Sequence, residues 1–254
     1  YDPGEVNLDV NGPDFISTTN TANSLLNPDL KLAHVQEVTA SIEHELFPSM
    51  SVRGLYLYRR SGDQFASINV LRPYSAFNIP LTRKDPGPDG VVNTADDGGF
   101  VTIYDYDPAY RGSRFVGNQN VNRPAGRDDW YHALEAAVMK RHADRWSLQA
   151  SYTATKYHRW IVAIAQNPND DHFPLDEAWR WALKLNGNYE FKHDIGIGAI
   201  MEFLNPPPGQ RTYTFRAADP LGGAPLRQLT TVNLRLEPFG AQKEQSVPIM
   251  NLRA

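Results

Sequence analysis

Residues 177–191, EAWRWALKLNGNYEF, alternate between two kinds of side chain. The odd-numbered positions from Trp179 to Phe191 are Trp, Leu, Gly, Tyr or Phe, whereas most even-numbered positions are charged or amide residues. Successive side chains of a β-strand point to opposite faces, so this period of two predicts a strand with one apolar and one polar face. A helix would instead mix Arg180 and Lys184 among the tryptophans.

This strand has the length and the ends of a membrane-spanning strand. Such a strand needs roughly 9–11 residues, and aromatic residues border an apolar band about 25 Å tall. Trp181 to Tyr189 extends about 26 Å, or about 20 Å of height after a tilt of about 40°. Trp179 to Phe191 gives about 30 Å by the same arithmetic, so the two aromatic pairs bracket the expected band. The alternative is a long strand of a soluble sandwich whose aromatic face lies in the core.

The same period recurs along much of the chain. It predicts further spanning strands at 32–46, 51–60, 130–142, 146–157, 195–203 and 226–237, and the start of one more at 247–252. Residues 1–30 are rich in turn-forming residues and are expected to form a loop with a short strand near Phe15.

The connections between these strands alternate in length. Short turns follow residues 46, 142 and 191, and long loops follow residues 60, 157 and 205. Outer-membrane barrels have short periplasmic turns and long extracellular loops. We therefore expect the segments at about 61–129, 158–176 and 206–225 to be extracellular, and the predicted fold class is all-β, an antiparallel transmembrane β-barrel.

A barrel in lipid must close, because an open strand edge leaves backbone groups without hydrogen-bond partners. The pattern supplies about 7–8 strands, and loops of this length suit a larger barrel. We expect residues 1–254 to be an incomplete fragment of such a barrel.

Composition removes several classes of function. The net charge is −4 and no Lys/Arg run occurs, so nothing indicates a nucleic-acid partner. Cysteine is absent, which removes disulfides, thiolate metal sites and cysteine nucleophiles. No HExxH, GxSxG, P-loop or dinucleotide motif occurs, and the seven histidines are scattered. Asp170, Asp171, Asp176 and Glu177 are expected to be solvated charges at a loop–strand junction. We predict that the protein is not an enzyme.

Several stretches resemble the C-terminal barrel half of TonB-dependent outer-membrane receptors, in particular the Oar-like branch, which carries a carboxypeptidase-regulatory-like domain. The stretches are LNPDLKLAHVQEVTASIEHEL (26–46), YDYDPAYRGS (104–113), GRDDWYHALEAAVMKR (126–141), SYTATKYH (151–158), NPNDDHFPLDEAWRWALKLNGNYEF (167–191) and RTYTFRAADPLGGAPLRQLTTVNLRLEPFGAQ (211–242).

The resemblance implies a barrel of about 22 strands that is closed by an N-terminal plug domain. It also implies the outer membrane of a Gram-negative-type bacterium, contact with lipid, coupling to the TonB complex, and uptake or binding of a large solute. The plug, the TonB box and the final aromatic-ended strand have no counterpart in this sequence. A structural or adhesive outer-membrane barrel without transport is the first alternative.

The polar positions of residues 177–191 are the main candidates for functional contacts. Lipid-facing charge costs a few kcal/mol at the midplane of a bilayer, so these side chains should face the lumen. There they would contact the plug or a solute. The predicted lumen-facing residues are Arg180, Lys184, Asn186, Asn188 and Glu190.

The acidic segment DPGPDGVVNTADDG, residues 85–98, is a candidate calcium loop. Asp85, Asp89 and Asp96 fall at positions 1, 5 and 12 of an EF-hand-like loop, and Asp97 is a substitute for Asp96. Position 3 is a glycine and no flanking helices are evident, so an ordinary acidic turn explains the same residues. A secreted calcium-binding β-sandwich module is the second alternative for the whole chain.

Overall fold

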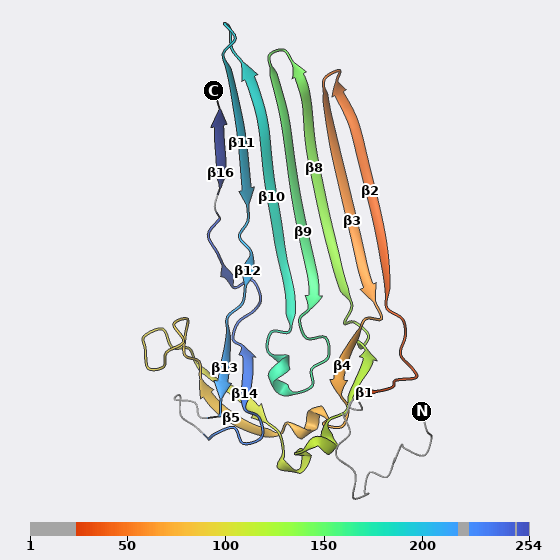
Figure 1. Ribbon diagram of the computed structural model, residues 1–254, viewed down its shortest axis with the longest axis vertical. Coiled ribbons are helices and arrows are strands. Elements are labelled where there is room, and N and C mark those ends of the chain that lie inside the picture. The colour runs from red at the N-terminus through yellow and green to blue at the C-terminus, as the bar shows by residue number, and fades with distance from the viewer. Residues whose placement is uncertain (1–23, 218–223, 247, 254) are drawn as a thin grey trace, which may run out of the picture.

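The structure is a computed structural model that describes residues 24–217, 224–246 and 248–253, and the strand predicted near Phe15 lies outside them. Within these residues the chain is all-β, with one long sheet and smaller sheets at one of its ends (Figure 1). Its helical elements are four short 3-10 turns, Tyr74–Ala76, Pro108–Tyr110, Ser113–Phe115 and Pro168–Asp171. The predictions of an all-β chain and of antiparallel pairing in the long sheet are confirmed.

The long sheet has seven antiparallel strands in the order β16-β11-β10-β9-β8-β3-β2. Their bounds are β2 (His34–Phe47), β3 (Met50–Gly62), β8 (Asp129–Ala143), β9 (Trp146–Trp160), β10 (Leu175–Glu190), β11 (Gly196–Leu204) and β16 (Ile249–Arg253). β10 has 16 residues, about three times the usual length of a soluble strand. The period of two therefore identified the long strands of this sheet.

The three hairpin turns of the long sheet lie together at the upper end in Figure 1, and the long connections lie at the other end. Between β8 and β9, Asp144 and Arg145 have φ of 53° and 70°. Positive φ at both central residues is the geometry of a type I′ turn, which matches the twist of paired strands. Between β10 and β11, His193 and Asp194 also have positive φ. The predicted alternation of short and long connections is confirmed for these strands.

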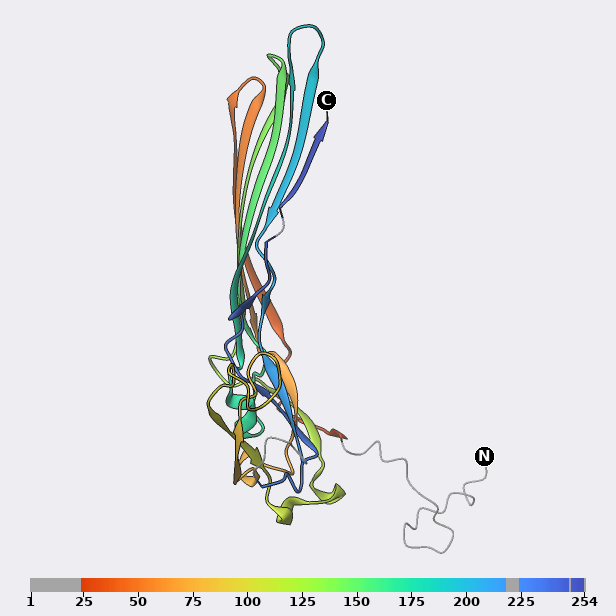
Figure 2. The ribbon, with the colours of Figure 1, turned by 90° about the vertical axis from the view of Figure 1, so that its left-hand side faces the viewer.

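The long sheet is a single open layer (Figure 2). β2 and β16 each have one neighbour, so both edges are unpaired within the described residues. Large apolar side chains on one face are exposed; for example, Ile42 is 72% exposed and Leu252 is 64% exposed. In the described part of the chain no second layer covers this face.

The smaller sheets form an end assembly around a compact core. In it, β5 (Ile79–Lys84) pairs with β6 (Phe100–Asp105), and β13 (Thr212–Arg216) pairs with β14 (Thr231–Arg235). The buried core residues are Leu81, Ile103, Phe215, Leu226, Val232 and Leu234. The remaining short strands are β1 (Ser24–Leu25), β4 (Phe65–Asn69), β7 (Asn118–Asn122), β12 (Pro208–Gly209) and β15 (Gln242–Lys243), of which β1 pairs parallel to β7.

The spanning strand predicted at 226–237 is wrong. Only Thr231–Arg235 forms a strand there, and it pairs with β13 in the end assembly rather than with the long sheet. Its alternation arises because Val232 and Leu234 point into the small core between exposed neighbours. The neighbour of β11 is instead β16, so the third long connection runs well beyond residue 225.

Candidate functional site: the polar face of the long sheet

Directly paired residues in the long sheet share a face, so its register assigns each strand residue to one of two faces. One row of paired residues crosses all seven strands on the apolar face: Met250, Met201, Leu185, Ala150, Val138, Val52 and His44. The next row, displaced by one residue, crosses on the polar face: Ile249, Glu202, Lys184, Ser151, Ala137, Arg53 and Glu43. The two files predicted for β10 therefore continue across its neighbours.

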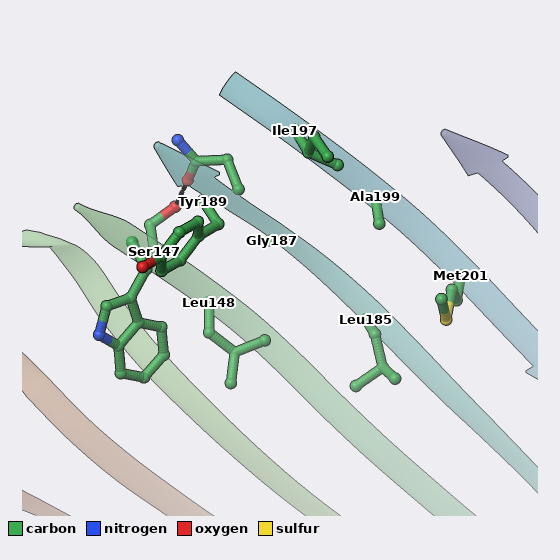
Figure 3. A pocket seen from close by; sticks show the side chains of 10 residues that line it. Ser147, Leu148, Leu185, Gly187, Tyr189, Ile197, Ala199 and Met201 are labelled. Atoms are coloured by element: carbon green, nitrogen blue, oxygen red, sulfur yellow. Dashed lines mark hydrogen bonds between the residues drawn. The ribbon is translucent and has the colours of Figure 1, made fainter. Parts of the chain in front are cut away.

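The apolar face has a shallow hollow around Gly187 (Figure 3). Gly187 has no side chain, and Leu148, Leu185 and Met201 stand around the gap. The hollow has a volume of about 490 Å³, and nearly all of its lining is hydrocarbon. Because it offers almost no hydrogen-bonding group, it is suited to contact with apolar chains and not to chemistry.

Aromatic and charged side chains cluster on the apolar face near the long connections. The rings of Trp130 and His158 stack 4.6 Å apart with an interplanar angle of 5°. Lys156 lies 5.5 Å from the Trp130 ring and 5.9 Å from the Trp179 ring. The Lys156 ammonium also pairs with Glu177. Rings with polar partners are the side chains found where a protein passes from hydrocarbon to water.

The opposite end of the apolar face, next to the hairpin turns, is also aromatic. Tyr189 and Phe191 contact each other edge to face at 4.8 Å. Lys140 is on the apolar file of β8, but its ammonium donates to the Ala143 carbonyl at 2.8 Å and lies 4.3 Å from the Trp146 ring. The charge thus reaches back to the turn, as a snorkelling lysine does at a membrane boundary.

All five predicted lumen-facing residues lie on the polar face, spread along β10. Lys184 pairs with Glu202 at 2.8 Å, and Asn188 accepts a hydrogen bond from Ser147. Glu190 lies 3.6 Å from His142 near the turn. Asn186 is directly opposite Gln149. These four side chains form cross-strand pairs and do not converge on one site.

The fifth residue, Arg180, lies next to Tyr157, which lines a cleft that the period of two does not indicate. Its guanidinium carbon lies 5.7 Å from the ring of Tyr157. Tyr157 is paired with Tyr131 on β8, and their ring centroids are 4.6 Å apart with an interplanar angle of 43°. The cleft has a volume of about 450 Å³. Its polar-face lining residues are Leu57, Arg59, Ser61, Asp129, Tyr131, Tyr157 and Arg159, and Trp130 and His158 complete the lining.

Carboxylates pair with most of the arginines around this cleft. Arg59 pairs with Glu37 at 2.6 Å, and Arg159 pairs with Asp176 at 2.7 Å. The Asp129 carboxylate accepts from the Trp160 backbone N–H at 2.9 Å and lies 2.9 Å from an Arg123 nitrogen. Among the described residues no ion pair involves Arg180. Asp176 is only 2% exposed, so the expectation that it is a solvated charge is wrong.

The acidic segment 85–98 is held by cations of the chain itself. Asp85 accepts from both terminal nitrogens of Arg211, at 2.5 and 2.7 Å, and this bond holds the pKa of the carboxyl below its usual range. The Lys84 ammonium bonds Asp97 and lowers the pKa of that carboxyl. The Thr94 hydroxyl donates to Asp96 at 2.7 Å and lowers its pKa. Asp89 accepts from the Val91 N–H at 2.8 Å.

These four carboxylates are not gathered around one point, and no group of three or more His, Cys, Asp or Glu suited to a metal occurs in the described ranges. A calcium ion at Asp85 would compete with Arg211, and one at Asp97 would compete with Lys84. Calcium binding by this segment therefore stays a prediction, with two identified competitors.

Aromatic residues of the long connections mostly contact one another. Phe77 packs edge to face on Tyr106 at 5.7 Å, and the Tyr110 and Phe115 rings are 5.2 Å apart. The Tyr74 hydroxyl donates to Asp171 at 2.5 Å, and this bond raises the pKa of Tyr74 to about 12. These contacts stabilise the connections and do not form a shared cleft.

Comparison with known proteins adds no assignment. No family model matches the chain, and no curated protein and no solved structure matches it. None of the helices in the described segments is long and apolar enough to cross a membrane.

Proposed function

We propose that this chain is part of an outer-membrane β-barrel of the TonB-dependent receptor type, which takes up or binds a large solute. The observation that carries the proposal is the sheet itself: one face is mainly apolar, and the other carries most of the charged and amide side chains of the long strands. Aromatic residues lie at both ends of the apolar face, and the three hairpin turns of the long sheet lie at one end. Lipid would contact the apolar face, and the polar face would line the lumen.

The unpaired edges of β2 and β16 support a larger barrel. Open edges are not tolerated in hydrocarbon, where backbone groups find no water. Further strands of the same protein would therefore continue the sheet from both edges. A soluble sandwich would need a second sheet against the apolar face, and the described residues supply none.

The proposal is tested on the full-length protein by membrane fractionation, followed by heat-dependent gel mobility of the detergent extract. Recovery in the outer membrane with a mobility shift on heating supports a closed barrel. Recovery as a soluble protein without detergent would refute it and favour the calcium-binding sandwich module. A barrel whose solute uptake does not depend on inner-membrane energisation would favour the structural or adhesive alternative.

A further inference from the structure

We propose that the polar-face cleft at Tyr131 and Tyr157 binds a neutral oligosaccharide. This inference rests on the proposed function, because it takes the polar face as the water-filled side of the sheet. It goes further by assigning a solute class and the residues that contact it.

An exposed tyrosine ring on the polar face, packed against a second, half-buried tyrosine ring, is the first reason. Most neighbours of Tyr157 on this face are small or charged: Thr155 on its own strand, Ala178 directly opposite, and Arg180 beside it. Tyr157 is nevertheless 37% exposed, and its ring lies against Tyr131. A pair of tyrosines on the watery side of a sheet offers an apolar surface with hydroxyls at its rim. A sugar ring has the matching shape, with a C–H face and hydroxyls around it.

The polar groups around the rings are the second reason. Guanidinium groups only donate and carboxylates only accept, whereas a sugar hydroxyl does both. Arg59, Arg159, Asp129 and Ser61 all line the cleft, which therefore presents both donor and acceptor groups.

Charge balance is the third reason, and it favours a neutral ligand. Arg59, Arg123 and Arg159 each already face a carboxylate, at 2.6, 2.9 and 2.7 Å. A strongly anionic solute would compete with these carboxylates. The cleft volume of about 450 Å³ falls in the range of about 300–1,000 Å³ that is usual for small-molecule sites.

The experiment uses the full-length protein in detergent, first on an array of neutral and acidic oligosaccharides. The best neutral ligand is then titrated calorimetrically against the wild type, Tyr157→Ala and Tyr152→Ala. Tyr152 is the matched control, because it is on the same strand and is also 37% exposed, but lies on the apolar face near Trp181. Tyr157→Ala should weaken binding about tenfold, while Tyr152→Ala should leave it unchanged. Arg180→Gln should change the affinity less than threefold for a neutral ligand.

Several results would overturn the inference. These are no binding to any neutral glycan, equal losses in Tyr157→Ala and Tyr152→Ala, or a preference for acidic glycans that Arg180→Gln abolishes. Heat-dependent mobility of each variant is measured alongside. A protein that keeps the mobility shift but binds no glycan refutes only this inference, whereas a wild type without the shift refutes the barrel proposal itself.

Discussion

Arg211 donates hydrogen bonds to both carboxylate oxygens of Asp85, at 2.5 and 2.7 Å, although the residues are 126 positions apart. The pair joins the start of the acidic segment to the beginning of the β13 hairpin. Asp85 is 7% exposed, so its charge depends on this partner. The bond is thus a long-range tie within the end assembly.

Arg211→Met should loosen the acidic segment. A hydrogen bond to a charged group contributes about 1.5–3 kcal/mol, and its loss leaves Asp85 as a nearly buried, unpaired charge. We expect faster cleavage of residues 85–98 by proteinase K on intact cells. Arg111→Met is the control, because Arg111 is an exposed residue of the same assembly. Equal protease resistance of the two variants would contradict a stabilising role of the Arg211–Asp85 bond.

The Asp85–Arg211 bond also predicts that the acidic segment 85–98 loosens at low pH. The pKa of Asp85 is lowered in the folded state by its bond to Arg211, so its contribution is fully present above the ordinary carboxyl pKa of about 3.9. It is lost as the pH falls below that value through the lowered pKa. Pepsin cleavage of residues 85–98 should therefore rise steeply below about pH 4 in the wild type. In Asp85→Asn this rise should be smaller, and an identical rise would contradict the assignment.

A calcium ion bound at Asp85 would have to displace Arg211. If the segment binds calcium, Arg211→Met should raise its affinity about tenfold or more, because a positive charge leaves the site. Radioactive calcium binding to the wild type and to the variant measures this effect. Asp89→Asn in the variant background should reverse the gain. Unchanged binding in Arg211→Met would contradict calcium binding at this segment.

Just beyond the end of β11, the Asn205 side chain makes hydrogen bonds to the backbone of β10. Its side-chain oxygen accepts from the Trp181 N–H at 2.6 Å, and its side-chain nitrogen donates to the Trp179 carbonyl at 3.1 Å. Asn205→Ala should speed amide hydrogen exchange at Trp181 about tenfold, the effect of a hydrogen bond of about 1–1.5 kcal/mol. Asn186→Ala is the control, because Asn186 is on β10 with Trp181; in this variant the exchange at Trp181 should match the wild type. No difference between the variants would contradict this role.

Sequence pattern predicted the long sheet well, because its strands alternate over many residues without interruption. Trp181 to Tyr189 could be assigned to one face from the period alone. The pattern failed at 226–237, since alternation reports which side chains are buried and not what buries them. Val232 and Leu234 are fully covered by a small core, which gives the same alternation as a spanning strand. The pairing of β16 with β11 could not be predicted, because the sequence of a five-residue strand does not specify which strand it pairs with.

The candidate site was predictable only in part. The polar file of β10 was read correctly, including Arg180, because facing depends on position along one strand. The cleft depends on the pairing of Tyr131 with Tyr157, which requires the register between β8 and β9. The sequence shows that residues 85–98 are acidic. It does not show that Arg211, from a distant hairpin, bonds Asp85, because that contact depends on the tertiary fold.

Comparison of opposite faces on one strand tests the central claim most directly. Leu183→Arg and Asn186→Arg are introduced separately into β10 of the full-length protein, and assembly into the outer membrane is measured by heat-dependent mobility. Leu183→Arg should block assembly, because arginine on a lipid-facing strand costs about 2–4 kcal/mol near the midplane, while Asn186→Arg should assemble normally. Leu148→Arg and Ser151→Arg repeat the comparison on β9. Equal tolerance on both faces would contradict the barrel.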